Sequence, residues 1–502
     1  MNRLCFIAIV LSMSALHAQP VFIKDSLEQY ILRGMDQWQI PGLAIAIVKD
    51  GQIVHMKGYG VKDIKSKEPV DENTLFMIGS NTKVFTATAL TILEQQKKLS
   101  LDDKVTKWLP YFKLKDPLAG EAATVRDLLS HRIGFETFQG DFVYWASTLT
   151  RKEVIGKMAL IKAPYGFRAK YGYCNAAFAA AGEVVPAVTG QAWEDFIREN
   201  ILKPLKMNHT QMLVADLPKA SNIAVPYTMV ANKLTALQYA PIDNLAPAGT
   251  MSSSAKDMVN WLKIQIDFGM FEGQQVIPKE AIVQTRMPQS IRGLDQRDKQ
   301  YTHFRLYGLG TALSDRDGKL IVGHTGGVDG FLSSVMIVPE DKLGIVVLTN
   351  TDQNGLFQNL TNEIRDAYLN LPYVGYSNNE LQASKKEHLA NNHKTDSLKS
   401  IVAQKNKSAL PLASYVGKYT NEVYGDIALV AIENKLKITF SHHPTLTGSL
   451  DFLKDNSFLC TYSVPTYGVK AFPFHVKDGK ITGFTLTVSD FVEFTPYEFV
   501  RN

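Results

Sequence analysis

Two places in the sequence have a serine followed three residues later by a lysine, a spacing that could pair a nucleophile with its own base. They begin at Ser80 and Ser253. Residues three apart lie on one face of a helix, so the lysine amine could sit beside the serine hydroxyl. Such a pair could attack a carbonyl carbon and form an acyl-serine intermediate. About two matches are expected by chance in a chain of this length, so the spacing alone does not choose between them.

The segment that follows Ser80 favours the first pair. Its apolar residues, between Val84 and Leu93, fall all round a helix rather than on one stripe, which is typical of a buried helix. Burial would disfavour the charged form of Lys83 and move its pKa toward the range in which an amine accepts a proton. If the helix starts at Ser80, the serine also lies at its positive end, where developing negative charge is stabilised.

Two later segments offer the further polar groups that an activated serine needs. Tyr173 and Asn175 are two residues apart, so their side chains would lie on the same side of an extended segment. His324 and Thr325 are followed by glycines 326 and 327, which would let a substrate carbonyl approach the backbone closely. These groups could relay a proton, hold a substrate amide and stabilise an oxyanion.

The order of these segments distinguishes the two serines. Ser80 is followed by Tyr173-x-Asn175 and then by His324, whereas no Tyr-x-Asn lies between Ser253 and His324. The other Tyr-x-Asn sequences begin at Tyr368, Tyr376 and Tyr419, all after His324.

Taken together, Ser80-x-x-Lys83, Tyr173-x-Asn175 and His324-Thr325-Gly326 resemble the three signatures of the serine β-lactamase and penicillin-binding-protein superfamily. The resemblance is to the class C-like branch, which also holds D-aminopeptidases, DD-carboxypeptidases and esterases. It extends from about Glu28 to Tyr368 and includes residues 124–135, 201–212 and 247–262. Since the last of these segments contains Ser253, the second serine-lysine pair falls on a structural part of the family.

The resemblance implies an acyl-enzyme mechanism without a cofactor. Ser80 would be the nucleophile, with Lys83 and Tyr173 sharing the roles of base and proton relay, and which of them takes the first proton stays open. The implied substrate-binding residues are Asn175, His324, Thr325 and Gly326, and the implied oxyanion hole consists of the backbone N–H groups of Ser80 and Gly327.

One departure from the family pattern bears on the substrate. Penicillin-specific members usually have lysine where this chain has His324, and histidine is mostly neutral at pH 7 unless perturbed, so it attracts a substrate carboxylate less firmly. We therefore expect a hydrolase acting on a D-amino-acid peptide or a small ester. The alternatives are a class C-like β-lactamase and, from another class, a catalytically silent penicillin-binding or interaction module.

The patterns around the motifs predict the elements that would position them. Residues 42–63 have the pattern of a hairpin with a tight turn at 49–51, and residues 307–350 have the pattern of further antiparallel strands. We expect the hairpin and these strands to form one sheet. Helical patterns dominate residues 101–268. These patterns agree with the fold class that the resemblance implies, the α/β (α+β) β-lactamase/DD-peptidase-like fold, an antiparallel sheet flanked by helices with a helical subdomain.

Domain boundaries follow from shifts in composition. We expect a signal peptide at 1–18, the hydrolase domain at 19–373 and a polar linker, partly helical or not, at 374–409. From residue 410 onward short β-like runs alternate with turns, which predicts a small antiparallel barrel or sandwich. Residues 410–502 resemble the lipocalin-like domain that follows some of these hydrolases.

The N-terminal segment and the charge predict where the chain acts and with what partners. Arg3 precedes an apolar run that ends before Ala18, the pattern of a secretory signal, so we expect an exported, periplasmic or secreted protein with no membrane span after cleavage. Among 502 residues the net charge is only +5 and there is no Lys/Arg block, so nucleic acid is not an expected partner. The expected partner is a small-molecule or peptide substrate.

Histidine and cysteine residues outside these motifs are expected to be structural. His442 and His443 would point to opposite faces of a strand and have no carboxylate or cysteine nearby, so no metal is expected. His131 and Cys174 are expected to pack in the interior. Cys174 and Cys460 do not form a disulfide framework.

Overall fold

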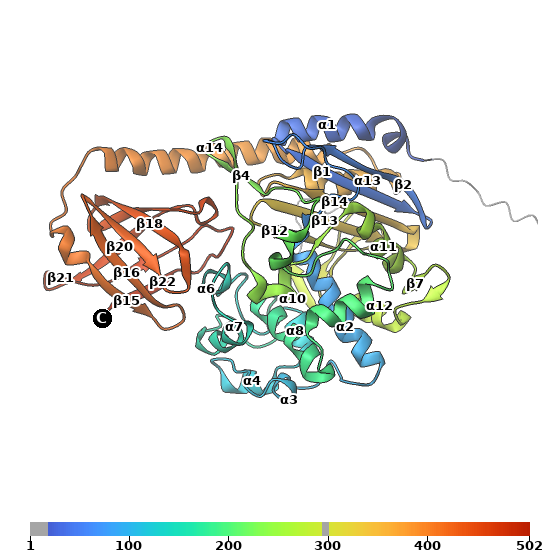
Figure 1. Cartoon of the computed structure of the whole chain (residues 1–502), viewed down its shortest axis with the longest axis horizontal. Helices are drawn as coiled ribbons and strands as arrows, with labels where there is room; N and C mark the ends of the chain where they lie inside the picture. The colour runs from blue at the N-terminus through green and yellow to red at the C-terminus, as the bar shows by residue number, and fades with distance from the viewer. Residues whose placement is uncertain (1–18, 294–300) are drawn as a thin grey trace, which may run out of the picture.

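The structure is a computed structural model that describes residues 19–293 and 301–502 (Figure 1). The predicted signal peptide, residues 1–18, lies outside the described residues. The described chain forms a region of sheet and helices and a separate C-terminal barrel, joined by one long helix (Figure 1). Within the described residues, no helix is both long and apolar enough to cross a bilayer.

The first region is built on an antiparallel sheet. Among the described strands its order is β2-β1-β14-β13-β12-β11-β10-β9, so the first hairpin does complete the later strands, with Ile45 opposite Val347. The bounds are β1 Gly42–Lys49, β2 Gln52–Gly60, β9 Ser290–Gly293, β10 Arg305–Tyr307, β11 Ala312–Arg316, β12 Lys319–Val328, β13 Phe331–Val338 and β14 Leu343–Thr349.

Both faces of the sheet are covered by helices, because alternate side chains of its central strands are apolar on both sides. In β1, Leu43 and Ile45 face one apolar cluster whereas Ala44 and Ala46 face the other. The helices on the first face are α1 (Leu27–Trp38) and α13 (Leu356–Tyr368), and those on the second include α2 (Thr82–Gln95) and α11 (Ala255–Ile266).

The helix after Ser80 is buried, as predicted, but it begins later than expected. Ser80 lies in a short 3₁₀ turn, Gly79–Asn81, and α2 continues from Thr82 with every side chain buried as far as Leu93. Gly79 has a φ of 52°, a left-handed conformation that glycine adopts without strain. This turn redirects the chain from strand β3 (Phe76–Met77) into the helix.

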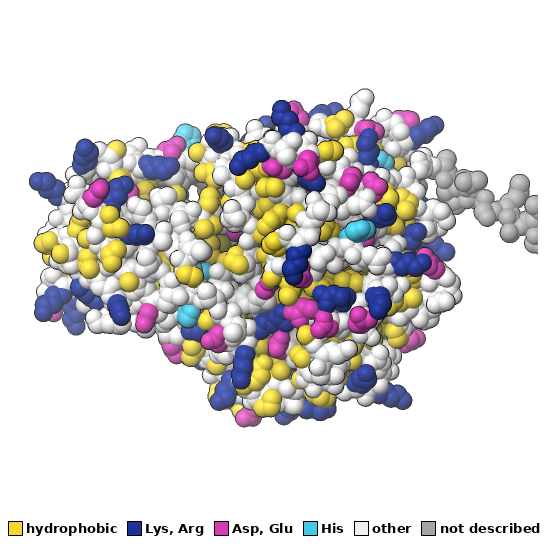
Figure 2. Space-filling view, in the orientation of Figure 1, with side chains coloured by type: hydrophobic (Ala, Val, Ile, Leu, Met, Phe, Trp, Pro, Cys, Tyr) yellow, Lys and Arg dark blue, Asp and Glu magenta, His cyan; other side chains and the backbone are white. Residues whose placement is uncertain are grey.

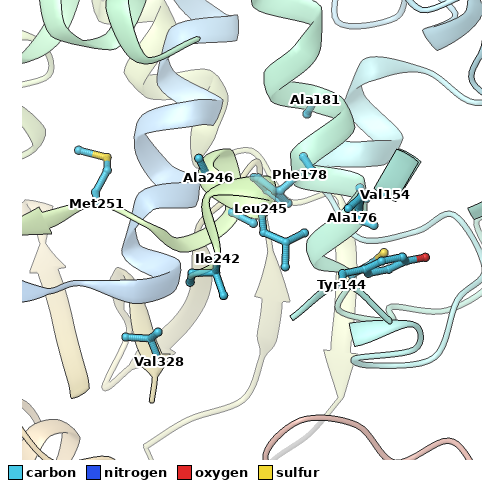
Figure 3. Packing of buried hydrophobic residues seen from close by; sticks show 14 of the residues in the cluster. Tyr144, Val154, Ala176, Phe178, Ala181, Ile242, Leu245, Ala246, Met251 and Val328 are labelled. Atoms are coloured by element: carbon cyan, nitrogen blue, oxygen red, sulfur yellow. The ribbon is translucent and has the colours of Figure 1, made fainter. Parts of the chain in front are cut away.

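A helical subdomain lies beside α2 and supplies the remaining walls of the site. Its core is packed from α7, α8 and α10, with Val154, Phe178 and Ala246 among the buried side chains (Figure 3). The remaining α-helices described before α14 are α3 Val105–Trp108, α4 Pro117–Ala122, α5 Val125–Leu129, α6 Asp141–Tyr144, α7 Arg151–Lys157, α8 Asn175–Thr189, α9 Trp193–Ile197, α10 Ala246–Gly249 and α12 Lys279–Thr285. The short strands pair two by two: β4 Tyr227–Val230 with β5 Lys233–Ala236, β6 Ser252–Ser253 with β3, and β7 Met270–Phe271 with β8 Gln274–Gln275.

The segment expected as a polar linker is a long helix, α14 (Tyr376–Ala403), that runs from the sheet region toward the barrel (Figure 1). The described residues beyond it form a closed antiparallel barrel. Its strands are β15 Gly417–Asn421, β16 Gly425–Ile432, β17 Lys435–Phe440, β18 His443–Lys454, β19 Ser457–Tyr462, β20 Val469–Lys477, β21 Lys480–Leu486 and β22 Tyr497–Arg501.

The charged side chains are spread over the surface. Figure 2 shows Lys and Arg interspersed with Asp and Glu across the visible face, rather than gathered in one basic patch. In the described part of the chain Cys174 and Cys460 are both buried and carry free thiols.

Candidate active site

Ser80 and Lys83 are in direct contact at the start of α2. Lys83 Nζ lies 3.0 Å from Ser80 Oγ, and it also donates to Asn175 Oδ1 at 2.7 Å and to the Ala248 carbonyl at 2.8 Å. A neutral lysine amine has two N–H groups and one lone pair. With Asn175 and Ala248 taking the two N–H groups, the lone pair is directed toward the Ser80 hydroxyl.

The surroundings of Lys83 favour that neutral form. Its side chain is fully buried, and desolvation lowers the pKa of Lys83 to about 7, although the carboxyl of Asp141 acts in the opposite direction. A substantial fraction of the amine is therefore unprotonated at neutral pH and able to accept the Ser80 proton.

Tyr173 closes the site on the other side of Lys83. Its ring centre lies 4.6 Å from Lys83 Nζ, and its hydroxyl faces Ser80. Burial raises the pKa of Tyr173 well above its usual value, outweighing the opposing effect of Ser80, so the phenol keeps its proton at neutral pH. Among the described residues, none makes a hydrogen bond of ordinary geometry to this hydroxyl, which leaves it available to a ligand.

Asn175 connects Lys83 to a buried carboxyl group. Its amide Nδ2 donates to Asp141 Oδ2 at 2.7 Å while its Oδ1 accepts from Lys83. Desolvation raises the pKa of Asp141 well above its usual value, and the neighbouring Glu493 raises it further. The two hydrogen bonds fix the orientation of the Asn175 amide and hold Lys83 beside Ser80.

His324 is on β12 and lines the same cavity as an uncharged group. Its Nδ1 lies 2.5 Å from the Thr325 carbonyl oxygen, which can only accept, so Nδ1 carries the proton and Nε2 accepts from the Tyr307 hydroxyl at 3.0 Å. Burial, followed by the effect of Lys83, lowers the pKa of His324 to about 3. His324 is therefore neutral throughout the physiological range, and cannot pair electrostatically with a carboxylate.

The backbone groups proposed as an oxyanion hole come together where β12 meets the turn before α2. A Cβ atom on Gly79 would lie 2.8 Å from the backbone N of Gly327, and one on Gly326 would lie 1.9 Å from the carbonyl oxygen of Ile78. Neither position tolerates a side chain, which explains the glycines. The Ser80 and Gly327 amides therefore lie on adjoining backbone segments.

A cavity of about 400 Å³ contains these groups. Its lining includes Ser80, Tyr173, Asn175, His324, Thr325 and Gly327 from the sequence motifs. Gly326 is predicted as a substrate-binding residue but does not line this cavity, because it packs against Ile78. Arg292 on β9 adds a cation to the wall, and Phe491 and Val492 reach it from the C-terminal barrel.

The second serine-lysine pair has a structural environment. Ser253 is buried, and its Oγ lies 2.8 Å from Thr210 Oγ1. Ser254 caps α11 by accepting from the Asp257 N–H. His131 and Cys174 are also buried, with the Cys174 N–H donating to His131 Nδ1 at 3.1 Å.

Asp141, Arg292, Tyr307 and Phe491 are cavity residues that the motifs do not reveal. Each comes from a different segment, and none stands in a pattern with a recognisable spacing. Only the folded chain brings them to Ser80.

The fold and this constellation are those of serine hydrolases related to β-lactamases and penicillin-binding proteins. Residues 27–369 match the family described as Beta-lactamase, and residues 403–501 match a domain of unknown function (DUF3471). Since the first match covers most of the chain, the chain belongs to the beta-lactamase family.

Known proteins resemble both parts of the chain. Protein flp of Staphylococcus aureus (strain COL) is 28% identical over 333 residues, which are 65% of this chain and 63% of that protein. The match thus spans less than two thirds of that relative's length. Unguisins hydrolase ungD of Aspergillus violaceofuscus (strain CBS 115571) is 25% identical over 454 residues, 83% of this chain and 78% of that protein.

One solved structure shares the overall fold. The octameric penicillin-binding protein homologue from Pyrococcus abyssi superimposes with a TM-score of 0.62 at 22% sequence identity, covering 95% of this chain and 99% of that one.

Proposed function

We propose that this protein is an exported serine hydrolase that cleaves an amide or ester bond through an acyl-Ser80 intermediate, with a D-amino-acid peptide or a small ester as substrate. The observation that carries the proposal is the contact between Lys83 Nζ and Ser80 Oγ at 3.0 Å. Export is supported by the apolar N-terminal run that ends before Ala18.

The first step is attack of Ser80 Oγ on the substrate carbonyl carbon. Lys83 takes the hydroxyl proton, because its pKa of about 7 makes it a base at neutral pH whereas the Tyr173 phenol keeps its own proton. The Ser80 and Gly327 amides stabilise the oxyanion. Tyr173 then relays a proton to the leaving group as the tetrahedral intermediate collapses to the acyl-enzyme.

Water completes the cycle. The Tyr173 hydroxyl orients a water molecule, and the Lys83 amine takes its proton as the water attacks the acyl carbon. The acyl group leaves as the free acid, and Ser80 recovers its proton. The relative named unguisins hydrolase ungD supports hydrolysis as the reaction class.

The preference for peptides or esters over β-lactams rests on His324. Because its imidazole is neutral, the β12 strand offers a polar wall rather than a cation to the substrate. Recognition of a substrate carboxylate falls to Arg292 in β9, which also lines the cavity.

A class C-like β-lactamase is the second candidate, favoured by the family to which residues 27–369 belong. A panel of a chromogenic cephalosporin, a D-alanine anilide and a short-chain p-nitrophenyl ester separates the two. We expect turnover of the anilide or the ester. Turnover of the cephalosporin alone would contradict the proposed substrate class.

A further inference from the structure

Among the contacts between the C-terminal barrel and the catalytic region is a buried carboxylate. Glu493 lies in the loop between β21 and β22, and its side chain is removed from solvent. Its Oε1 accepts from the Gly140 N–H at 2.8 Å and its Oε2 from the Phe142 N–H at 2.9 Å. The Tyr497 hydroxyl donates to the same carboxylate, 3.1 and 2.9 Å from its two oxygens.

The residue between these two amides belongs to the active site. Asp141 points away from the barrel and accepts from Asn175 Nδ2, and Asn175 in turn accepts from Lys83. A continuous set of contacts therefore runs from Glu493 in one folded region, through α6, to the amine beside Ser80 in the other.

Phe142, the next residue along α6, attaches this helix to the barrel through its side chain. Phe142 is fully buried against barrel side chains, with its ring stacked on Tyr424 at a centroid distance of 5.0 Å and packed edge-on against Tyr497 at 5.3 Å. Glu493 thus extends from the barrel to the backbone of α6, and Phe142 extends from α6 into the barrel. Together these two contacts fix the position of α6.

The same barrel loop forms part of the cavity wall. Phe491 and Val492 line the same cavity as Ser80, Tyr307 and His324. The interior of the barrel is itself packed with aromatic rings, such as Phe474 against Phe484 at 4.8 Å. The barrel therefore meets the active site through its end loop.

We propose that the barrel is a working part of the active site, in which Glu493 is a positioning residue for the Asp141, Asn175 and Lys83 network and Phe491 is a wall of the substrate subsite. This rests on the proposed function of Ser80 as nucleophile. A substrate that extends from Ser80 toward the barrel must present an apolar group to Phe491 and Val492.

Replacement of Glu493 by glutamine tests the positioning role. The amide keeps one acceptor oxygen but turns an NH₂ group toward a backbone N–H, so α6 loses one of its two anchoring hydrogen bonds. Glu498→Gln is the matched control, since Glu498 is on the neighbouring strand and exposed, and the side-chain bonds of its carboxylate in the described chain are to His475 and Thr485.

The readout is the labelling of Ser80 by a fluorophosphonate at increasing concentrations in the full-length protein. For Glu493→Gln we expect the maximal labelling rate to fall by about tenfold to a hundredfold, because small displacements of catalytic groups are costly. The half-saturating concentration stays unchanged, because Glu493 does not touch the ligand. Hydrogen exchange should rise in residues 140–145 of this variant, and Glu498→Gln should match the native protein in all three measurements.

A second variant tests the role of Phe491 in the substrate subsite, and its result does not depend on whether Glu493→Gln is stable. Phe491 is 40% exposed, so Phe491→Ala should fold, raise the half-saturating concentration of a probe with a large apolar group severalfold and leave its maximal rate unchanged. Unaltered labelling kinetics in Glu493→Gln or in Phe491→Ala contradict the role of that residue. A native protein that is not labelled at all contradicts the proposed function, and this proposal with it.

Discussion

Asn175 Oδ1 accepts a hydrogen bond of 2.7 Å from Lys83 Nζ, although 92 residues separate the two in the chain. The same amide is tied to Asp141 on its other side. Asn175 thus orients Lys83, and Asp141 in turn orients Asn175. Such supporting hydrogen bonds keep a catalytic base in one orientation.

Removing this amide should impair the chemical step. We predict that Asn175→Ala lowers kcat by about a hundredfold, because Lys83 loses an acceptor that orients its lone pair toward Ser80. Steady-state kinetics with the best substrate of the panel measure the effect. Asn359→Ala is the control, since it removes a buried amide on α13 that bonds to Glu380 away from the cavity. Equal kcat values for the two variants would mean that Asn175 does not position the base.

The rate should depend on pH through Lys83. Below its pKa of about 7 the amine carries a proton and cannot accept another, so kcat/KM should rise with pH and level off above an inflection near 7. His324 has a pKa of about 3 and contributes nothing in this range, so His324→Gln should keep the inflection. A profile that is flat between about pH 5.5 and 8.5 would contradict Lys83 as the base.

Arg292 should select for substrates with a free carboxylate. We predict that Arg292→Ala raises KM about tenfold for a peptide with a C-terminal carboxylate, since an ion pair with a guanidinium is lost. An uncharged p-nitrophenyl ester serves as the internal control, and its KM should not change. The same KM shift for both substrates would indicate a general disturbance of β9 instead of a carboxylate subsite.

Phe142 should couple the stability of the two folded regions. Truncation of a buried phenylalanine costs about 3 to 5 kcal/mol, so Phe142→Ala should lower the free energy of unfolding by that amount and split urea denaturation into two transitions. Phe304→Ala removes a ring that is 60% exposed and should change stability by less than about 0.5 kcal/mol. A single, unshifted transition for Phe142→Ala would contradict the anchoring of α6 by the barrel.

The sequence carries enough information to place the core of the site. Ser80, Lys83, Tyr173, Asn175 and His324 stand in a unique order. In the structure Ser80, Tyr173, Asn175 and His324 line one cavity, and Lys83 is buried behind its wall in contact with Ser80. The sheet and the barrel could be predicted as well, because period-2 patterns mark their strands.

Other features could not be predicted, for physical reasons. Glu493 and Asp141 meet only because two folded regions dock, and a lone carboxylate in a loop has no periodic signature. Polar composition leaves open how much of the linker at residues 374–409 is helical, and in the structure residues 376–403 form one continuous helix, α14. The 3₁₀ turn at Ser80 depends on the left-handed Gly79 and its contact with β12.

The central claim is that Ser80 is the nucleophile that forms the covalent intermediate. Mass spectrometry of the intact and digested protein after reaction with a fluorescent penicillin, which acylates serine, or a fluorophosphonate, which phosphonylates it, tests the claim most directly. We predict a single adduct on the native protein that maps to the peptide containing Ser80, the same adduct on Ser253→Ala, and none on Ser80→Ala. An adduct that persists in Ser80→Ala, or a native protein that forms none with either reagent, would contradict the account.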